Sequence, residues 1–493
     1  MFYEAFVRSF SDSNGDGIGD LPGLTAKLDY INDGDPTTSS DLGVTGLWLM
    51  PTFPSPSYHG YDVTDYRAVN PDYGTLDDLR GLVKAAHDRG VAVILDMPFN
   101  HTSDQHPWFL DSQQPGSEHA DWYVWADAPQ GNGWHRSGDR FYYGAFGPSL
   151  PDLNLRNADV TAELTSVAAF WLDSVGVDGF RLDAAKHLIE DGPVTENTPE
   201  THAWWHDLRD TLRQSTAGPL LVGEVWDTPQ ISSSYVPDDL DMTFDFGLAS
   251  VYVSAAGTGD GQTLGRVLTR ITGLYPPMGF GAFLTNHDMD RVASQLGGDA
   301  ARLRLAAGLL LTGPGVPFVY YGEEIGMTGQ KPDERIRTPM RWDASGPGAG
   351  FSTHAPWEEL SPDPASVNVA DESGDSGSLL SWYRQLIALR SAHEALSTGT
   401  YSTVTASDRS VTAELRTAPQ ESLLVLANLS PSAVSGPSLR LESSVLCGSP
   451  SARMVLGDGV PAAPALTSSG GFSDYRPLES LPGSSLSVIS LGR

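Results

Sequence analysis

The chain has 493 residues, enough for a large core and for more than one domain. It contains 62 acidic residues against 30 lysines and arginines, which gives a formal net charge of −32. Because a field of this sign repels phosphate groups and anionic lipids, neither nucleic acid nor a membrane surface is an expected partner.

The cysteine content and the N-terminal sequence bear on the compartment. Cys447 is the only cysteine, so no intrachain disulfide can form. The sequence has neither a signal peptide nor an apolar run of roughly 18 residues, the length of a membrane span. It begins abruptly with "MFYEAFVRSF", which has the pattern of a core strand and predicts that an upstream segment was trimmed together with an export signal. We therefore expect a secreted or periplasmic protein, with a cytoplasmic one as the alternative.

Short apolar runs alternate with amphipathic stretches along the first 390 or so residues. Near-continuous apolar strands that alternate with helices indicate a parallel sheet covered by helices. Eight such units predict an α/β fold, a (β/α)8 TIM barrel. The predicted strands span residues 2–8, 44–50, 91–97, 177–183, 218–224, 241–246, 279–285 and 316–321.

Two insertions and a change of composition divide the chain. Residues 101–157 follow the third strand, are rich in Trp, Tyr, Gly and Asp, and predict a small inserted lobe. The catalytic barrel is then expected to comprise residues 1–100 and 158–396. From residue 397 to 493, short alternating runs broken by Ser, Pro and Gly predict a C-terminal antiparallel β-sandwich domain.

Acidic side chains stand where three predicted strands end, namely Asp183, Glu224 and Asp288. The carboxyl ends of barrel strands form one face, and that face carries the active site in such enzymes. A single carboxylate there is more often a helix cap than a catalyst. Three on separate strands, with His101 and His287 beside them, are not explained as caps and predict an active site.

One of these strands, "VDGFRLD" (177–183), carries opposite charges on one face. Side chains alternate along a strand, so Arg181 and Asp183 point the same way. A structural ion pair is one explanation. The other, which we favour, is that Arg181 keeps Asp183 ionised at the edge of a site.

The ordered motifs "DMPFNH", "GFRLDAAKH", "GEVW" and "FLTNHD" resemble the four signature regions of the α-amylase family, glycoside hydrolase family 13. "LPDLN" resembles its fifth region, and "GYDVTDY" resembles the loop that supplies its stacking tyrosine. The likeness runs from residue 2 to about residue 396. Within the family, the sequence is similar to the bacterial α-amylases intermediate between oligo-1,6-glucosidases and neopullulanases.

The resemblance implies a retaining hydrolase of α-1,4-glucosidic bonds, with starch, maltodextrins and malto-oligosaccharides as substrates. Asp183 would be the nucleophile, Glu224 the acid and base, and Asp288 a third catalytic carboxylate that holds sugar hydroxyls. Retaining glycosidases do use two carboxyl groups about 5 Å apart, one as nucleophile and one as proton donor. We expect the enzyme to be a monomer.

The resemblance also implies a set of substrate-binding side chains. Plain core packing is the alternative for Tyr61, and a surface ion pair is the alternative for Asp333 with Arg337. Lys186 could instead cap a helix end or pair with Glu190. The implied residues are Tyr61, Asp62, His101, Arg181, Lys186, His287, Asp333 and Arg337.

A candidate calcium loop lies at residues 11–20, "SDSNGDGIGD". Its oxygen donors fall at positions 1, 3, 5, 7 and 9 of a calcium-binding loop. The closing glutamate is missing and the loop follows a strand, so it is not an EF-hand; an Asp/Asn/Gly turn without metal is the alternative. The candidate Ca²⁺ ligands are Asp12, Asn14, Asp16, the Ile18 carbonyl and Asp20. A second calcium, through Asn100, Asp152 and the His187 carbonyl, is implied by the resemblance.

Several other functions stay open. An α-glucosidase, an oligo-1,6-glucosidase or a transglycosylating, sucrose-acting enzyme of the same family is one group of alternatives. A non-catalytic carbohydrate-binding relative is another, which the three retained acids disfavour. The small Ala184 and the pair Lys186 and His187 resemble the residues that α-1,4-acting amylases place beside the cleaved bond, so the sequence favours α-1,4 cleavage.

Overall fold

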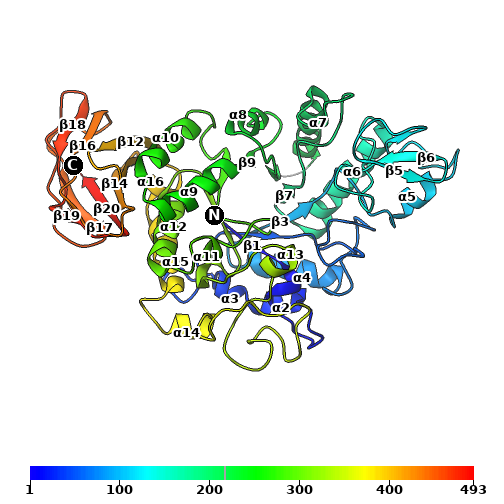
Figure 1. Cartoon of the computed structure of the whole chain (residues 1–493), viewed down its shortest axis with the longest axis horizontal. Helices are drawn as coiled ribbons and strands as arrows, with labels where there is room; N and C mark the ends of the chain where they lie inside the picture. Colours follow the sequence, from blue (N-terminus) through cyan, green and yellow to red (C-terminus); the bar gives the residue numbers. More distant parts are fainter. Residues whose placement is uncertain (216–217, 493) are drawn as a thin grey trace.

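The computed structural model describes residues 1–215 and 218–492 (Figure 1). Eight parallel strands close into a barrel in the spatial order β1, β11, β10, β9, β8, β7, β3, β2. The predicted TIM barrel is thus confirmed. Its strands are β1 (Phe2–Ala5), β2 (Gly46–Leu49), β3 (Ala92–Met97), β7 (Gly179–Leu182), β8 (Leu220–Gly223), β9 (Met242–Phe244), β10 (Phe280–Ala282) and β11 (Val316–Tyr320).

The inside of the barrel has an apolar floor and a charged layer above it. Phe2, Trp48 and Ile94 belong to the apolar cluster inside the barrel. Because side chains alternate along a strand, Glu4 and Asp96, two residues further on, share that inward face. Asp96 is paired in register with Arg181 of β7. The strands therefore place buried charges directly above the apolar floor, toward their carboxyl ends.

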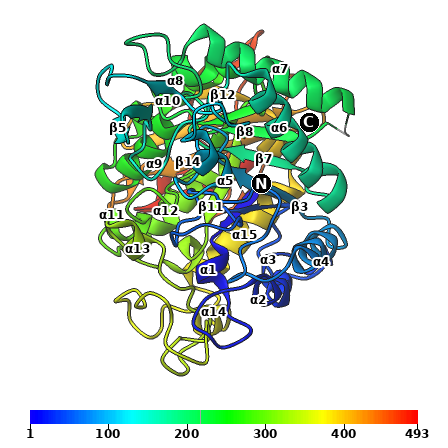
Figure 2. The same cartoon turned by 90° about the vertical axis from the view of Figure 1, so that its right-hand side faces the viewer.

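Helices cover the barrel, and their starts carry clear caps. Thr75 forms a capping box with Asp78 at the start of α4, and the Asn157 side chain caps α6. Seen from the side of the lobe, α4, α6 and α7 surround strands β3, β7 and β8 (Figure 2). The longer helices are α4 (Leu76–His87), α6 (Ala158–Ala169), α7 (Pro199–Ser215), α9 (Phe246–Thr258), α10 (Gly261–Thr272), α12 (Ala300–Thr312) and α15 (Leu379–Ala392). Short helices are α1 (Val7–Phe10), α2 (Leu21–Ala26), α3 (Leu28–Ile31), α5 (Pro107–Ser112), α8 (Pro229–Ser232), α11 (Val292–Gln295), α13 (Asp333–Ile336), α14 (Val369–Ser373) and α16 (Glu394–Ser397), with a π-helical turn η1 (Phe170–Val175) and 3-10 turns η2 (Ser233–Tyr235) and η3 (Glu323–Ile325).

The segment after β3 forms a small lobe at one end of the molecule (Figure 1). Its sheet has three antiparallel strands in the order β4 (Trp125–Ala126), β6 (Arg140–Tyr143), β5 (Trp134–Ser137). Phe109 of α5 packs against Tyr123, Trp125 and Tyr142 in an aromatic core. A bridge between His101 and Asp152 ties the two ends of the lobe together beside the barrel.

The C-terminal domain lies at the opposite end (Figure 1). Its main sheet is antiparallel, and strands from both halves of the sheet share one apolar core. The buried Arg416 donates to the carbonyl oxygen of Thr312 at 2.6 Å, which fixes the domain to the end of α12. Its strands are β12 (Thr400–Ala406), β13 (Val411–Ala418), β14 (Glu421–Asn428), β16 (Leu439–Ser443), β17 (Ser451–Leu456), β18 (Gly470–Tyr475) and β20 (Ser485–Gly492), with a separate pair β15 (Val434–Ser435) and β19 (Ser480–Leu481).

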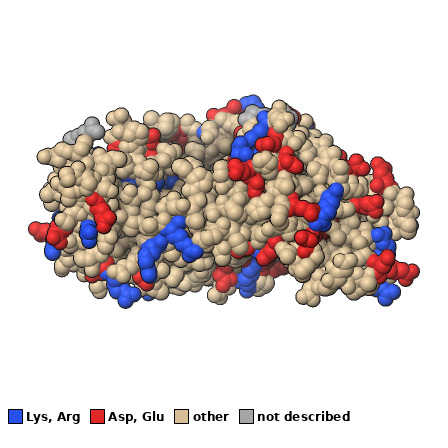
Figure 3. All heavy atoms as spheres, turned by 90° about the horizontal axis from the view of Figure 1, so that it is seen from above, with Lys and Arg blue, Asp and Glu red and all other residues tan. Residues whose placement is uncertain are grey.

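Acidic and basic side chains are interspersed with uncharged ones over the face shown in Figure 3. Within the described part of the chain, no helix combines the length and the apolar character that crossing a bilayer requires.

Candidate active site

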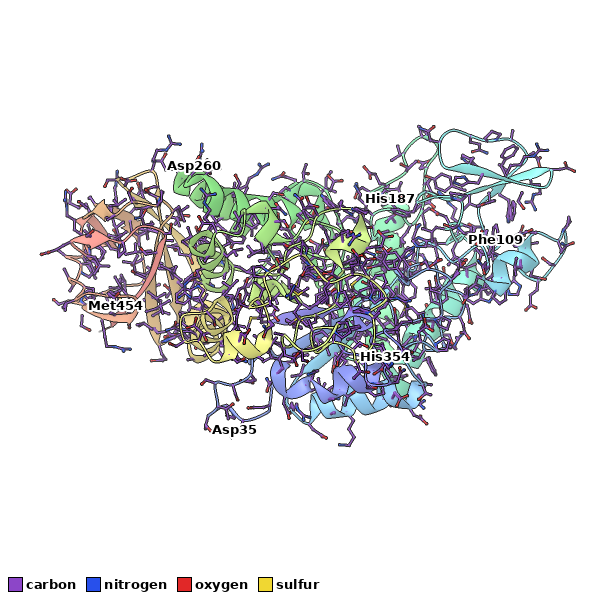
Figure 4. All side chains as sticks on the ribbon, turned by 60° about the horizontal axis from the view of Figure 1, so that its bottom comes forward. Asp35, Phe109, His187, Asp260, His354 and Met454 are labelled. Atoms are coloured by element: carbon purple, nitrogen blue, oxygen red, sulfur yellow. The ribbon has the colours of Figure 1, made fainter. Side chains whose placement is uncertain are left out.

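A cavity of about 520 Å³ opens at the carboxyl ends of the barrel strands, beneath the lobe. His187, which lines it, lies where the lobe approaches the barrel, whereas Phe109 stands further out in the lobe (Figure 4). The lining residues are His59, Tyr61, His101, Phe146, Leu150, Asp183, Ala184, Lys186, His187, Glu224, Trp226, Asp288, Asp333 and Arg337. The structure therefore brings the three strand-end carboxylates to one cavity.

Arg181 is the centre of the charged layer. Its side chain is 1% exposed, and its Nη1 atom lies 2.8 Å from Asp96 Oδ1 and 2.6 Å from Asp183 Oδ1. Its Nη2 atom lies 2.7 Å from Glu224 Oε2. One buried guanidinium thus holds three carboxyl groups, and it sets Asp183 and Glu224 side by side at the floor of the cavity.

The surroundings of Glu224 raise its pKa. Burial raises the pKa of Glu224, and the charges of Asp183 and Asp288 raise it further, whereas Arg181 opposes them. The backbone N–H of Ala184 donates to Glu224 Oε2 at 3.0 Å and fixes the carboxyl group. A carboxyl group with a raised pKa beside a second carboxyl group suits a proton donor next to a nucleophile.

A second charged group surrounds Asp288. Arg337 Nη2 donates to Asp288 Oδ1 at 2.8 Å, and His287 Nε2 lies 3.2 Å from Asp288 Oδ2. Burial alone would raise the pKa of Asp288, but the charges of His287 and Arg337 hold it well below its usual range. Asp288 therefore stays ionised while it faces the cavity.

Tyr61 and His101 line the cavity, whereas Asp62 does not. The Tyr61 ring stacks on His287 at 5.7 Å between centroids, and its hydroxyl donates to Asp96 Oδ2 at 3.0 Å, so Tyr61 belongs to the polar site rather than to plain core packing. Burial lowers the pKa of His101 to about 4, which leaves a neutral ring toward the cavity. Asp62 is buried behind His59 and accepts hydrogen bonds from the Ser55 and Ser57 hydroxyls.

Lys186 stands in a turn at the cavity mouth and does not cap a helix. Its Nζ atom lies 2.7 Å from Glu196 Oε2 and 3.5 Å from Asp227 Oδ2, and no ion pair with Glu190 is found in the described part of the chain. The pairing with Glu190 is therefore wrong, because the chain turns after Lys186 instead of continuing as a helix.

The pair Asp333 and Arg337 belongs to the cavity rather than to the open surface. Arg337 is 2% exposed, and its Nη2 atom bridges Asp288 and Asp333, the latter at 3.2 Å. Lys331 forms a second ion pair with Asp333 from the solvent side. The pair thus connects the cavity carboxylate Asp288 to the rim.

Sequence reasoning missed several residues of the site. Asp96 and Glu4 are charges inside apolar strands, which is the same signal that singled out Arg181, so both could have been found. Glu196 has no such signal, because it reaches Lys186 only through the fold. Phe146 and Trp226 line the cavity while 47% and 48% exposed, and exposed aromatic residues in loops carry no distinctive pattern.

The 11–20 loop contains the expected oxygen atoms, but local hydrogen bonds engage them. Asp12 accepts backbone N–H groups from Asn14, Gly15 and Gly17, and Asp20 accepts from Ser13 and caps α2. Gly15 of the loop faces Thr353 and His354, and His354 is labelled next to the blue part of the barrel in Figure 4. Among the described residues, no group of three or more His, Cys, Asp or Glu is arranged to hold a metal ion.

A different set of oxygen atoms lies between barrel and lobe. Asn100 Oδ1, Asp152 Oδ2 and Glu190 Oε1 are buried and have no hydrogen-bond partner. Burial raises the pKa of Asp152 well above its usual value, and the neighbouring Glu190 raises it further. Buried unpaired oxygen atoms are costly, and a hard cation such as Ca²⁺ prefers such ligands. This donor set fits a calcium ion better than the 11–20 loop does.

A TIM barrel whose strand ends gather acidic side chains around one cavity has the architecture of a barrel glycosidase. The chain belongs to the α-amylase family: the model of the family's catalytic domain, described as "Alpha amylase, catalytic domain", matches residues 4–399. It is therefore a glycoside hydrolase of family 13, as its motifs predicted.

Named relatives cover most of the chain. Alpha-amylase 3 of Dictyoglomus thermophilum is 38% identical over 437 residues, 87% of this chain and 84% of that protein. Trehalose synthase/amylase TreS of Mycolicibacterium smegmatis is 35% identical and covers 84% of this chain and 79% of its own. The crystal structure of an α-amylase from H. orenii matches with a TM-score of 0.84, at 38% identity, over 100% of this chain and 99% of that one. Relatives of similar identity thus carry names of different activities.

Proposed function

We propose that this protein is an α-amylase that cleaves α-1,4-glucosidic bonds in starch, maltodextrins and malto-oligosaccharides with retention of configuration. The observation that carries the proposal is the pair Asp183 and Glu224, held by one buried arginine at the floor of the cavity. Burial and the neighbouring charges of Asp183 and Asp288 raise the pKa of Glu224, which suits it to donate a proton beside Asp183.

The proposed reaction has two displacements. Asp183 attacks the anomeric carbon while Glu224 gives its proton to the departing glycosidic oxygen, so that an ester to Asp183 forms and the glycosidic bond breaks. Water then gives a proton to Glu224 and attacks the same carbon, which releases the sugar and restores the Asp183 carboxylate. Asp288, His101 and the ring of Tyr61 would hold the glucose unit during both steps.

The turn after the nucleophile supports α-1,4 specificity. Ala184 has a left-handed φ of 49° and presents only a methyl group, which leaves room beside the bond to be cleaved. Lys186 reaches the same cavity, and Glu196 and Asp227 hold its ammonium group. The third N–H of this ammonium group donates to the Trp226 carbonyl at 3.0 Å, so a hydroxyl of the leaving glucose unit would bind by replacing the long contact with Asp227.

We expect faster cleavage of maltoheptaose and starch than of isomaltose, measured as a time course of products by chromatography. Lys186→Ala should raise KM by about tenfold, the value of one charge-assisted hydrogen bond, or change the distribution of product lengths, with little change in melting temperature. Lys84→Ala removes an exposed lysine paired with Asp88 on α4 and serves as the matched control, with kinetics unchanged.

Faster turnover of isomaltose than of maltotetraose would contradict the α-1,4 proposal and favour the oligo-1,6-glucosidase alternative. Sucrose or maltose converted mainly into isomeric disaccharides would favour a transglycosylating enzyme. The transglycosylating alternative is considered because a relative named trehalose synthase/amylase is 35% identical to this chain. No turnover of any glucoside by the folded protein would leave the carbohydrate-binding alternative.

We also propose that the protein binds calcium. The cluster Asn100, Asp152 and Glu190 would hold the ion between barrel and lobe, and the 11–20 loop is a second proposed site. A cation there would neutralise buried carboxylates and fix the lobe over the cavity, which is a structural rather than a chemical contribution.

Removal of calcium with EDTA should lower the melting temperature by several degrees while changing kcat less, since a ligand bound only by the folded state stabilises it by about 3 kcal/mol at a hundredfold excess over Kd. Differential scanning calorimetry with elemental analysis measures both the effect and the ion. Asp152→Asn should abolish the EDTA effect if the lobe site holds the ion, and Asp12→Asn should do so for the loop. An unchanged melting temperature and no bound metal would refute both sites.

A further inference from the structure

Glu4 is a buried charge that the proposed reaction does not use. It stands in β1, is 2% exposed and faces the inside of the barrel above the apolar floor. Burying an isolated carboxylate costs several kcal/mol unless it is paired. Its partner is His287, whose Nδ1 atom lies 2.6 Å from Glu4 Oε1.

The second ring nitrogen of His287 faces acceptors as well. Its Nε2 atom lies 2.6 Å from the Tyr61 hydroxyl and 3.2 Å from Asp288 Oδ2. The Tyr61 hydroxyl donates its single proton to Asp96, so it accepts from His287. A neutral imidazole has one N–H group, and only the imidazolium can donate from both nitrogens.

We propose that Glu4 is a positioning residue of the active site, which holds His287 as a two-donor cation and thereby fixes Asp288 and Tyr61 in the cavity. The inference rests on the proposed function for its catalytic consequence. Its structural part, the charge state of His287, stands without it.

The other charges around His287 explain why Glu4 matters. Burial would lower the pKa of His287, yet the charges of Asp288 and Glu4 together raise it to about 10. Two guanidinium groups lie near this ring: Arg337 Nε donates to the His287 carbonyl at 2.9 Å, and Arg181 lies over the ring of Tyr61, which stacks on His287. The titratable and charged groups that face this ring are Glu4, Tyr61, Asp96, Arg181, Asp288 and Arg337.

The test is Glu4→Gln, which keeps the shape and the acceptor oxygen but removes the charge. A group with a raised pKa keeps its proton below that pKa and loses it as the pH rises through it. Wild-type His287 should therefore stay protonated to about pH 9, whereas in Glu4→Gln, where Asp288 alone opposes the effect of burial, it should lose its proton at a clearly lower pH. Nitrogen-15 NMR of the protein labelled at histidine, recorded without substrate over a range of pH, measures the protonation of His287. The His287→Gln variant serves to assign its signal.

Kinetics provide the second measurement. The kcat/KM of Glu4→Gln on maltoheptaose should match wild type at about pH 5.5 and fall about tenfold below it by about pH 8, as the imidazolium is lost. Glu4→Asp restores the charge and should recover most of the wild-type profile. Glu324→Gln is the matched control, a buried glutamate that accepts from Tyr3 and Tyr30 on the outer side of the barrel, and its pH profile should equal that of wild type.

A His287 that remains protonated in folded Glu4→Gln, with an unchanged pH profile, would overturn the proposal. If Glu4→Gln does not fold, the titration of wild-type His287 decides, since loss of its proton near the ordinary histidine pKa would overturn the proposal equally. The NMR titration requires no substrate, so it tests the charge state of His287 even if the protein does not cleave α-1,4 bonds. Failure of this inference and failure of the proposed function can therefore be told apart.

Discussion

Replacing Asp183 with asparagine is expected to lower kcat on maltoheptaose by roughly four orders of magnitude or more, because no other group can form the covalent intermediate. The amide keeps the size of the side chain and can still accept from Arg181 Nη1, which lies 2.6 Å away in the native protein. Circular dichroism and melting should therefore show a folded protein. Single-turnover and steady-state rates provide the measurement.

A comparison with Glu224→Gln distinguishes the two carboxyl groups. That variant should be equally poor on maltoheptaose but should retain most of its first-step rate on α-maltosyl fluoride, whose leaving group needs no proton. Asp183→Asn should be inactive on both substrates. Azide should partly rescue Asp183→Gly with inverted configuration. A folded Asp183→Asn with more than a few per cent of wild-type kcat would show that the nucleophile has been assigned wrongly.

The barrel could be predicted from the sequence because its strands are buried on both faces. Such strands read as short apolar runs, and all eight predicted runs contain a strand of the closed barrel. The carboxylates could be predicted for the same reason: a charge at the end of an apolar run has few explanations. Asp183 and Glu224 stood out in this way, and the fold then brought them to one guanidinium.

Contacts between distant loops could not be predicted. Glu196 pairs with Lys186 because the chain after Lys186 turns instead of forming a helix, and spacing alone suggested Glu190. Glu190 instead lies beside Asp152, across the boundary of barrel and lobe. Periodicity reports which face of an element is buried, but it does not report what a loop between elements meets.

Arg181→Met should be among the most destabilising single substitutions in the barrel. The native guanidinium is 1% exposed and holds Asp96, Asp183 and Glu224, so methionine of similar length leaves three carboxyl groups without their cation. Removing one partner of a buried ion pair lowers the free energy of unfolding by about 3–5 kcal/mol. Here three carboxyl groups lose their cation at once. Denaturant unfolding at neutral pH measures the difference, and kcat should fall with it.

The pH dependence separates this electrostatic cause from a packing defect. Burial already raises the pKa of Asp96 to about 7, although Arg181 opposes it, and the pKa of Glu224 is also raised. Without Arg181 these folded-state values rise further, so the variant takes up protons on folding and loses stability as the pH increases above the unfolded value of about 4. The deficit relative to wild type should therefore be small near pH 4 and grow through pH 7. The stability of Arg181→Lys, which keeps a charge, should lie between that of wild type and that of Arg181→Met. A stability deficit that does not change with pH would mean that lost packing, not charge, is responsible.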